Sequence, residues 1–321
     1  NYDEVGIDQV VGFNPTVFPI TIPESTQGTQ DVTEDDYGYS WRLSLEYDLR
    51  EAVMAYASVG QGYKGPGTNS LSSGPRAIKP VVDPEIPTSV EIGLKSLWWD
   101  NRLRVNGAVF YTEFEDFQTA QTRVNPSTQT LDFFLANAGK LETQGVELDV
   151  AAQVSERLNL TLVAAYIDAV YDDYTGAQCY QGQTEAQGCI EVAPGVGSQD
   201  LSGSELANSP DWSYTVGAQY NFPLMDTYSG YALASYTWQD EIQTSAVGNP
   251  RSKVDSYGTV DASFGLTNSN GRFCIQLFAK NLLYEFYETS GGPLGALGIE
   301  RLHTLAYTYE RRLGVALTLR L

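Results

Sequence analysis

Few side chains in this sequence have the types and spacing that catalysis or metal binding requires. The chain contains one histidine, His303, and three cysteines. Nine residues separate Cys179 from Cys189, which fits a loop disulfide in an oxidising compartment, whereas a metal site would need further ligands nearby. No nucleophile has a base at a meaningful spacing. We therefore expect no enzyme, no catalytic residue, no metal site and no cofactor.

Composition and charge exclude several classes of protein. The 321 residues include 19 Lys and Arg against 40 Asp and Glu, which gives a net charge of −21. A nucleic-acid-binding protein needs a basic face, and no cluster of Lys or Arg occurs here. An aromatic content of 12% argues against intrinsic disorder. No run of about 18 apolar residues predicts a transmembrane helix, and Asn1 is expected to lie inside a longer precursor or to follow a processing site.

Alternation of apolar and polar residues with a period of two runs along the whole chain. In residues 40–48, for example, Leu43 and Leu45 alternate with Ser44 and Glu46. Successive side chains of a β-strand point to opposite faces, so this segment predicts a strand with one apolar and one polar face. The same alternation recurs in three further segments, residues 103–112, 212–222 and 312–321.

The pattern predicts eleven strands that are joined by short and long links in alternation. The strands are expected at 38–48, 51–60, 87–98, 102–120, 132–154, 158–172, 208–222, 228–244, 254–267, 271–284 and 305–321. Short, turn-like links are expected near 48–51, 99–102, 155–157, 222–228 and 268–271. Long links are expected at 61–86, 121–131, 173–207, 245–253 and 285–304.

Two architectures use alternating strands of this kind. A soluble β-sandwich has strands of about five or six residues and no regular alternation of long and short links. An outer-membrane barrel has longer tilted strands, a lipid-facing apolar side, a polar lumen, short periplasmic turns and long extracellular loops. Aromatic residues line its interfaces, and Tyr47, Trp98, Trp99, Tyr220 and Tyr228 lie beside the short links here. We therefore favour an all-β fold, a transmembrane antiparallel β-barrel.

The number of strands indicates that these residues form only part of a barrel. Eleven antiparallel strands cannot close on themselves, because the first and the last strand would run parallel. An open edge in lipid would leave backbone N–H and C=O groups unsatisfied, at several kcal/mol each. Eleven is half of about 22, the number of strands in the plugged transporters. Residues 38–321 are therefore expected to form about the last eleven strands of a 22-stranded plugged barrel.

Six segments of the sequence form a recognisable series. They are YASVGQGYKGPGTN at 56–69, DPEIPTSVEIGLKS at 83–96, FYTEFEDFQ at 110–118, NAGKLETQGVELDV at 137–150, LSGSELANSPDWSYTVGAQY at 201–220 and KNLLYEFY at 280–287. In this order they resemble the C-terminal half of a TonB-dependent outer-membrane receptor, nearest to the iron-complex or siderophore receptors of α-proteobacteria. Two features depart from the family pattern. The chain ends in Leu321 rather than Phe or Trp, and Glu310-Arg311 replaces the usual Pro-Arg pair.

The resemblance implies a receptor in the outer membrane of a Gram-negative bacterium that imports a scarce, bulky solute, with a ferric siderophore or similar iron complex as the expected cargo. Import would use energy from TonB–ExbB–ExbD, through an N-terminal part with a plug domain that is absent from these residues. The other expected partners are outer-membrane lipid and lipopolysaccharide, with the receptor as a monomer. Residues 1–37 are expected to be an extracellular loop or the remnant of a preceding strand.

Two sets of residues are candidates for the functional site. Charged residues at polar strand positions would face the lumen and the plug, and these are Arg42, Glu46, Glu91, Lys95, Arg104, Glu147, Asp149, Asp261, Arg312 and Arg320. Aromatic residues nearest the long links would contact a ligand or form the extracellular girdle, and these are Tyr63, Phe133, Phe134, Tyr174, Tyr180, Trp238 and Tyr287. A passive porin-like channel and a structural or adhesive surface protein remain as alternative functions.

Overall fold

The computed structural model describes residues 2–9, 30–69, 81–124, 131–193, 196–224, 227–268, 270, 272–294, 299–305 and 310–320. Nearly all regular structure in these residues is β-strand, and the helical segments among them are short 3-10 turns at Glu185–Gln187 and Pro250–Ser252. In this described part of the chain, no helix has the length and apolar character needed to cross a membrane.

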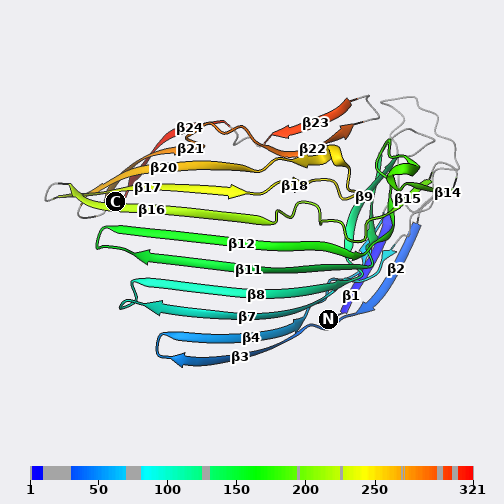
Figure 1. The fold of residues 1–321 in the computed structure, drawn as a ribbon, viewed down its shortest axis with the longest axis horizontal. Helices are drawn as coiled ribbons and strands as arrows, with labels where there is room; N and C mark the ends of the chain where they lie inside the picture. Colours follow the sequence, from blue (N-terminus) through cyan, green and yellow to red (C-terminus); the bar gives the residue numbers. More distant parts are fainter. Residues whose placement is uncertain are drawn as a thin grey trace.

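Eleven long strands form one antiparallel sheet (Figure 1). In chain order they are β3 (Trp41–Arg50), β4 (Val53–Gln61), β7 (Ile86–Trp98), β8 (Leu103–Glu115), β11 (Lys140–Gln153), β12 (Leu158–Asp173), β16 (Trp212–Leu224), β17 (Tyr228–Gln239), β20 (Tyr257–Asn268), β21 (Phe273–Lys280) and β24 (Arg312–Leu319). Each strand pairs with its neighbours in this order, so the sheet is a meander whose edges are β3 and β24. The expected number of strands is therefore confirmed, and the described sheet is open.

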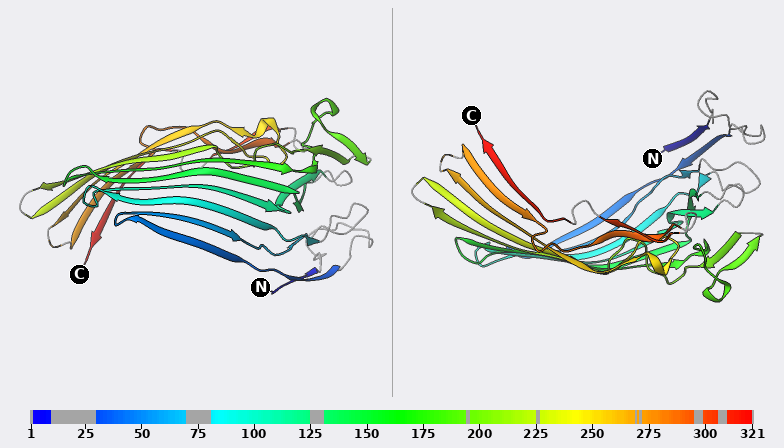
Figure 2. Two further views of the ribbon diagram at one scale, coloured as in Figure 1. Left: turned by 60° about the horizontal axis from the view of Figure 1, so that its bottom comes forward. Right: turned by 90° about the horizontal axis from the view of Figure 1, so that it is seen from above.

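The two ends of the sheet differ. All the short turns lie at one end, and the long connections gather at the other, which we call the rim end (Figure 1). The connections at the rim end contain small sheets of their own: β1 (Tyr2–Gln9) with β2 (Gln30–Tyr37), β5 (Gly67–Thr68) with β6 (Val81–Val82), β9 (Gln118–Val124) with β10 (Leu131–Asn137), β13 (Thr175–Gln178) and β14 (Ile190–Ala193) with β15 (Val196–Asp200), β18 (Ile242–Gln243) with β19 (Lys253–Val254), and β22 (Glu288–Leu294) with β23 (Ile299–Leu305). Figure 2 shows that the large sheet is strongly curved and twisted.

The register gives the sheet one apolar and one polar face. Residues paired across antiparallel strands share a face, and one such row joins Leu45, Ala57, Ile92, Val109 and Val146. Leu45 is 71% exposed and Ile92 is 58% exposed, so no part of the described protein covers this row. An uncovered apolar face of this extent fits contact with lipid.

The strand boundaries differ from the sequence expectation at several places. The strand expected at 102–120 ends at Glu115, because Asp116 adopts a positive φ of 52° and turns the chain. The strand expected at 132–154 is divided at residues 138–139, so β9 and β10 form a separate hairpin. The strands expected at 271–284 and 305–321 are shorter, ending at Lys280 and beginning at Arg312.

The shortening after Lys280 has a local cause. Asn281 and Tyr284 have positive φ values of 47° and 60°, which strand geometry does not allow. The buried side chain of Asn281 donates to the Glu285 carbonyl at 2.7 Å and accepts from the Glu285 N–H at 2.8 Å. This amide therefore replaces the bonds of a strand partner and fixes an irregular segment where alternation alone predicts a strand.

Candidate functional site

The charged candidates of the strands lie on the polar face. Cross-strand pairing places Glu46 opposite Tyr56, Tyr56 opposite Gly93, Gly93 opposite Ala108, and Ala108 opposite Glu147. The remaining charged candidates within the sheet have the same parity along their strands, and these are Arg42, Glu91, Lys95, Arg104, Asp149, Asp261 and Arg312. Arg320 follows β24 directly, and its N–H donates to the Arg272 carbonyl at 2.9 Å.

Several charges on the polar face are paired with one another. Arg104 donates to Asp149 at 3.0 Å, and Lys280 donates to Asp261 at 2.6 Å. The ammonium of Lys95 lies over the ring of Tyr56, 5.2 Å from its centroid, a geometry that is favourable for a cation and an aromatic face. This face can hold a polar partner through charge and hydrogen bonds. Among the described residues, no group of His, Cys, Asp and Glu has the arrangement of a metal site.

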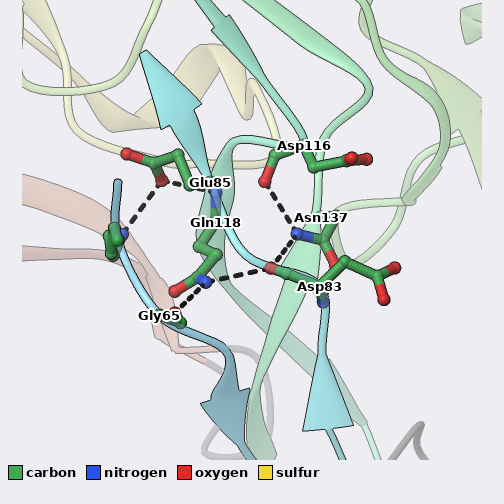
Figure 3. A network of polar contacts seen from close by, with 7 residues as sticks. Gly65, Asp83, Glu85, Asp116, Gln118 and Asn137 are labelled. Atoms are coloured by element: carbon green, nitrogen blue, oxygen red, sulfur yellow. Dashed lines mark hydrogen bonds and ion pairs between the residues drawn. The ribbon is translucent and has the colours of Figure 1, made fainter. Parts of the chain in front are cut away.

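A network of polar contacts joins the connections that follow β4 and β8 at the rim end (Figure 3). We call it the loop clasp, and it comprises Lys64, Asp83, Glu85, Gln118 and Asn137. The buried carboxylate of Glu85 accepts from the backbone N–H of Gln118 at 2.8 Å and from Lys64 Nζ at 2.9 Å. The side-chain amide of Gln118 donates to the carbonyls of Gly65 and Asp83 at 2.8 and 3.0 Å.

The side chain of Asn137 adds three further hydrogen bonds to the loop clasp. Its Oδ1 accepts from the Asp83 N–H at 2.9 Å, and its Nδ2 donates to the carbonyls of Asp83 and Asp116 at 3.0 and 2.7 Å (Figure 3). Beside the clasp, the amide of Asn69 exchanges two hydrogen bonds with the Leu135 backbone, at 2.9 and 2.7 Å. The side-chain amides of Asn137 and Asn69 thus bond to backbone groups as a neighbouring strand would, and they link the two connections.

The loop clasp brings together residues from four of the recognised sequence segments. Lys64 belongs to 56–69, Glu85 to 83–96, Gln118 to 110–118 and Asn137 to 137–150. None of these four residues was among the candidate site residues, because no strand alternation or catalytic spacing marks them. Their occurrence in the recognised segments was the signal that could have identified them.

A small apolar core packs under the rim connections. Tyr171, Tyr174, Leu141, Ala138, Ala177 and Leu201 are buried together, with Phe114 and Phe117 against them. The rings of Tyr171 and Tyr174 lie 5.0 Å apart, and Phe117 approaches Tyr171 edge-on at 6.3 Å. Burial raises the pKa of Tyr174 far above its usual value. This core fixes the connection after β12 onto the connection after β8.

A second set of contacts links the later connections. Gln199 is buried and donates to the carbonyls of Gln178 and Val247 at 2.6 and 2.9 Å. The hydroxyl of Thr244 donates to the Gly291 carbonyl at 3.0 Å. Residues 173–207, 240–256 and 281–294 are therefore connected to one another, so the rim connections support each other instead of projecting singly.

Cys179 and Cys189 form a disulfide within the connection after β12, with their Cα atoms 5.7 Å apart. Gly197 packs directly against this bond, because a Cβ there would lie 2.6 Å from one sulfur and 2.7 Å from the other. The third cysteine, Cys274, is a free, half-buried thiol on β21. The disulfide therefore braces the small sheet of β13, β14 and β15.

The aromatic candidates of the rim have different environments in the structure. Tyr174 is only 2% exposed and belongs to the apolar core, so its ring is withdrawn from any ligand. Trp238 lies on the apolar face, stacked on Tyr214 with their centroids 5.3 Å apart, as a girdle residue would. Phe134 is half-buried, and the side chain of Phe133 lies outside the described residues.

Three aromatic candidates remain near the rim on described side chains. The hydroxyl of Tyr63 donates to Asp36 at 2.5 Å. Tyr287 stacks on Tyr257 with their centroids 4.2 Å apart, and Tyr257 has the parity of the polar face. Tyr180 is half-buried, beside the disulfide, and its N–H donates to the Gln183 side chain at 3.0 Å.

Comparison with known proteins identifies the family of this eleven-stranded sheet. Residues 9–282 match the family described as "TonB dependent receptor-like, beta-barrel". The chain belongs to this family. TonB-dependent receptor barrels are outer-membrane proteins of Gram-negative bacteria, and the uncovered apolar face of this sheet fits that location.

Curated relatives of this receptor barrel include two receptors of other bacteria. The pesticin receptor of Yersinia pestis is 34% identical over 276 residues, which cover 86% of this chain and 36% of that protein. The catecholate siderophore receptor Fiu of Escherichia coli K12 is 26% identical over 282 residues, covering 84% of this chain and 33% of Fiu.

Solved structures show the same fold. The ferric yersiniabactin uptake receptor FyuA of Yersinia pestis gives a TM-score of 0.68 at 18% identity, covering 91% of this chain and 39% of FyuA. The siderophore receptor PiuA of Acinetobacter baumannii gives a TM-score of 0.66 at 20% identity, covering 93% of this chain and 38% of PiuA. The chain thus spans 33% to 39% of the length of these four proteins.

Proposed function

We propose that this chain is the C-terminal half of the barrel of an outer-membrane receptor that imports a ferric siderophore or similar iron complex. The observation that carries this proposal is the family match over an eleven-stranded sheet with all its long connections at one end. The long connections would receive the solute outside the cell, and the short turns would lie in the periplasm. The relatives named above support an iron complex as the cargo.

The edges of the sheet indicate how the barrel is completed. β3 and β24 are separated by nine strands of a meander, so both run toward the short-turn end. A second copy in the same orientation would therefore pair its β3 with β24 in parallel, whereas outer-membrane barrels are antiparallel. An odd number of additional strands restores antiparallel closure. Eleven more from the same polypeptide give about 22 strands and a monomer.

The polar face is proposed to hold a plug domain supplied by the same polypeptide. Lumen-facing charges in an empty barrel of this width would surround water, whereas a plugged barrel pairs them with a partner. The Arg104–Asp149 and Lys280–Asp261 pairs are only partly buried in the described chain, with Arg104 and Lys280 51% and 53% exposed. They thus remain accessible to a plug, which TonB–ExbB–ExbD would displace during import.

Radioactive iron uptake tests this proposal in cells that produce or lack the complete receptor, with and without functional TonB. We expect uptake of ferric siderophores to require both the receptor and TonB. Uptake that needs the receptor but not TonB would instead indicate a passive porin-like channel. Uptake that is unchanged by loss of the receptor would favour a structural or adhesive surface protein. Production of the receptor at equal levels in both strains is the necessary control.

A further inference from the structure

The aromatic side chains in the middle of the polar face lie down on the sheet. A side chain on a β-strand ordinarily stands roughly perpendicular to the sheet, so a ring on this face would project into the lumen of the proposed barrel. Four rings instead lie across the neighbouring strand, each over the glycine with which it is paired. These pairs, which we call the ring–glycine pairs, are Tyr56 with Gly93, Phe110 with Gly145, Tyr231 with Gly265 and Phe278 with Gly314.

The contacts at these glycines show how each ring is placed. A Cβ on Gly93, Gly265 or Gly314 would overlap the facing ring, and its three nearest atoms would all belong to that ring. A Cβ on Gly145 would lie 2.8 Å from the ring of Phe110. The four rings are half-buried, although no second sheet of the described chain covers this face (Figure 2). Glycine therefore provides the space that each ring occupies.

The register places all four pairs on the polar face. Each pair shares its row or its strand parity with a charged residue of that face, and these residues are Glu46, Glu91, Asp261 and Arg312 in chain order. Phe114, Tyr171 and Tyr257 have the same parity but belong to the rim end, where they contact other rings. The ring–glycine pairs therefore account for every other aromatic side chain on the polar face of the described large sheet.

The pairs recur at equivalent places in the topology. Each ring belongs to a strand that runs from the short turns toward the rim, namely β4, β8, β17 or β21, and each glycine belongs to the strand that returns (Figure 1). At the remaining junction of this kind in the described sheet, between β12 and β16, a Cβ on Gly217 would lie 2.6 Å from the Thr161 hydroxyl. The interior of a strand ordinarily disfavours glycine, so its recurrence under the rings indicates a use for the space it leaves.

The spread of the rings over the sheet fits a large, folded partner. The pairs extend from β4 to β24 and therefore cover almost the full width of the described sheet. A small solute could touch one or two of these places at once, whereas a folded domain that fills the barrel would contact the wall at all of them. The plug of the proposed receptor is such a domain. A ring that stood upright would occupy space at the surface of the plug.

We propose that the ring–glycine pairs set the clearance of the lumen wall, so that the plug of the complete receptor seats against rings held down on the sheet. The inference rests on the proposed function, which supplies the plug from the same polypeptide, and it adds which residues of this wall determine the fit. The glycines act through the rings and are therefore positioning residues. Replacing a glycine should raise its ring, and removing the same ring should cancel that effect.

Ion conductance of the complete receptor, purified and reconstituted into planar lipid bilayers, tests the inference. The variant G93A/G265A should raise two rings, since the nearest atoms to a Cβ at either position belong to the ring. A barrel of about 22 strands without a seated plug would be a wide aqueous channel. We expect the wild type to stay closed and the variant to conduct at least about tenfold more current, because its plug no longer seats fully.

Two further variants separate the effect of the rings from that of the glycines themselves. Y56A/G93A/Y231A/G265A removes both raised rings and should return the conductance close to the wild-type value, whereas a merely structural need for glycine would leave it high. G230A/G258A makes matched changes on the lipid-facing side, where the rings of Phe222 and Tyr236 lie over the two glycines. This control should stay closed.

Three results would overturn the inference and leave the proposed function intact. They are a closed G93A/G265A, a leak that removal of the rings does not reduce, and an equal leak in G230A/G258A. Heat-modifiable migration in gels checks that each barrel is folded, and G93A and G265A singly replace a double variant that does not fold. A wild-type receptor that conducts as an open channel would instead contradict the plug, and with it the proposed function.

Discussion

The carboxylate of Glu85 accepts a hydrogen bond from the backbone N–H of Gln118 at 2.8 Å, although Gln118 lies 33 positions further along the chain. The same carboxylate binds Lys64, so one buried acid ties together the start and the end of one long connection and the start of the next. This contact therefore joins the two connections of the rim to each other.

Replacement of Glu85 is expected to free the connections that follow β4 and β8 from each other. Glu85→Ala leaves the buried Gln118 N–H without an acceptor, at a cost of about 1–3 kcal/mol. Glu85→Gln keeps an acceptor oxygen and should retain most of the contact. Hydrogen exchange of the Gln118 amide in the complete receptor measures the difference. Equal exchange rates in the wild type and Glu85→Ala would show that the clasp does not hold this connection.

Two substitutions of Tyr174 distinguish the contribution of its ring to stability from that of its hydroxyl. Its hydroxyl is buried and has no hydrogen-bond partner among the described residues. Tyr174→Phe should therefore be neutral or stabilising by up to about 1 kcal/mol, since it removes a group whose burial is uncompensated. Tyr174→Ala removes the ring from the rim core and should cost about 3–5 kcal/mol. Limited proteolysis of residues 173–207 reports both effects, and equal cleavage of the two variants would contradict this view of the core.

The disulfide should depend on a glycine that contacts it. Gly197→Ala brings a Cβ to within 2.7 Å of both sulfur atoms, so the cysteines must separate or the strand must shift. We expect alkylation of unfolded, non-reduced protein to label Cys274 alone in the wild type and all three cysteines in part of the Gly197→Ala protein. Gly107→Ala is the control, because its Cβ meets only a carbonyl at 3.6 Å. Complete protection of Cys179 and Cys189 in both variants would contradict the prediction.

Asp211 is expected to make the folded protein less stable as the pH rises, which is opposite to the usual effect of a carboxylate. Partial burial first, and then Asp168, Asp240 and Glu241, raise the pKa of Asp211 above its usual 3.8. A raised pKa means that the folded protein holds the proton more tightly, so the stabilising contribution of this group is present at low pH and is lost as pH rises through the folded pKa.

Asp211→Asn should consequently stabilise the complete receptor at neutral pH, by less than about 1 kcal/mol because water screens this exposed group. The gain should vanish at about pH 3 and below, where the aspartate is largely protonated in both states. Thermal unfolding in detergent at several pH values measures it. A gain of equal size at pH 3 and pH 7 would rule out the titration of Asp211 as its cause.

The strands were predictable because their signal is local. Successive side chains of a strand point to opposite faces, so Leu43 and Leu45 alternate with polar residues and share the lipid-facing side. The same local alternation marks each of the eleven strands in the sequence. Breaks such as Asp116 and Asn281 depend on single positive φ values and side-chain bonds, which alternation does not encode. The sequence consequently predicted strands that were too long at these positions.

The rim was less predictable because its contacts join residues far apart in the chain. The environment of Tyr174 is set by Leu141 and Leu201, which no pattern near Tyr174 reveals. The residues of the loop clasp were likewise missed as site residues, although Glu85 and Asn137 lie in recognised segments. Parity along a strand, in contrast, was sufficient to place Glu147 and Asp149 on the polar face.

We propose that further strands of the same polypeptide close this open sheet and that its plug domain fills the barrel. The intact mass of the native protein, extracted from outer membranes, is the first measurement to make. We expect a mass more than twice the 35.2 kDa of these 321 residues, since about eleven further strands and a plug would be added. A native mass near 35 kDa would contradict it.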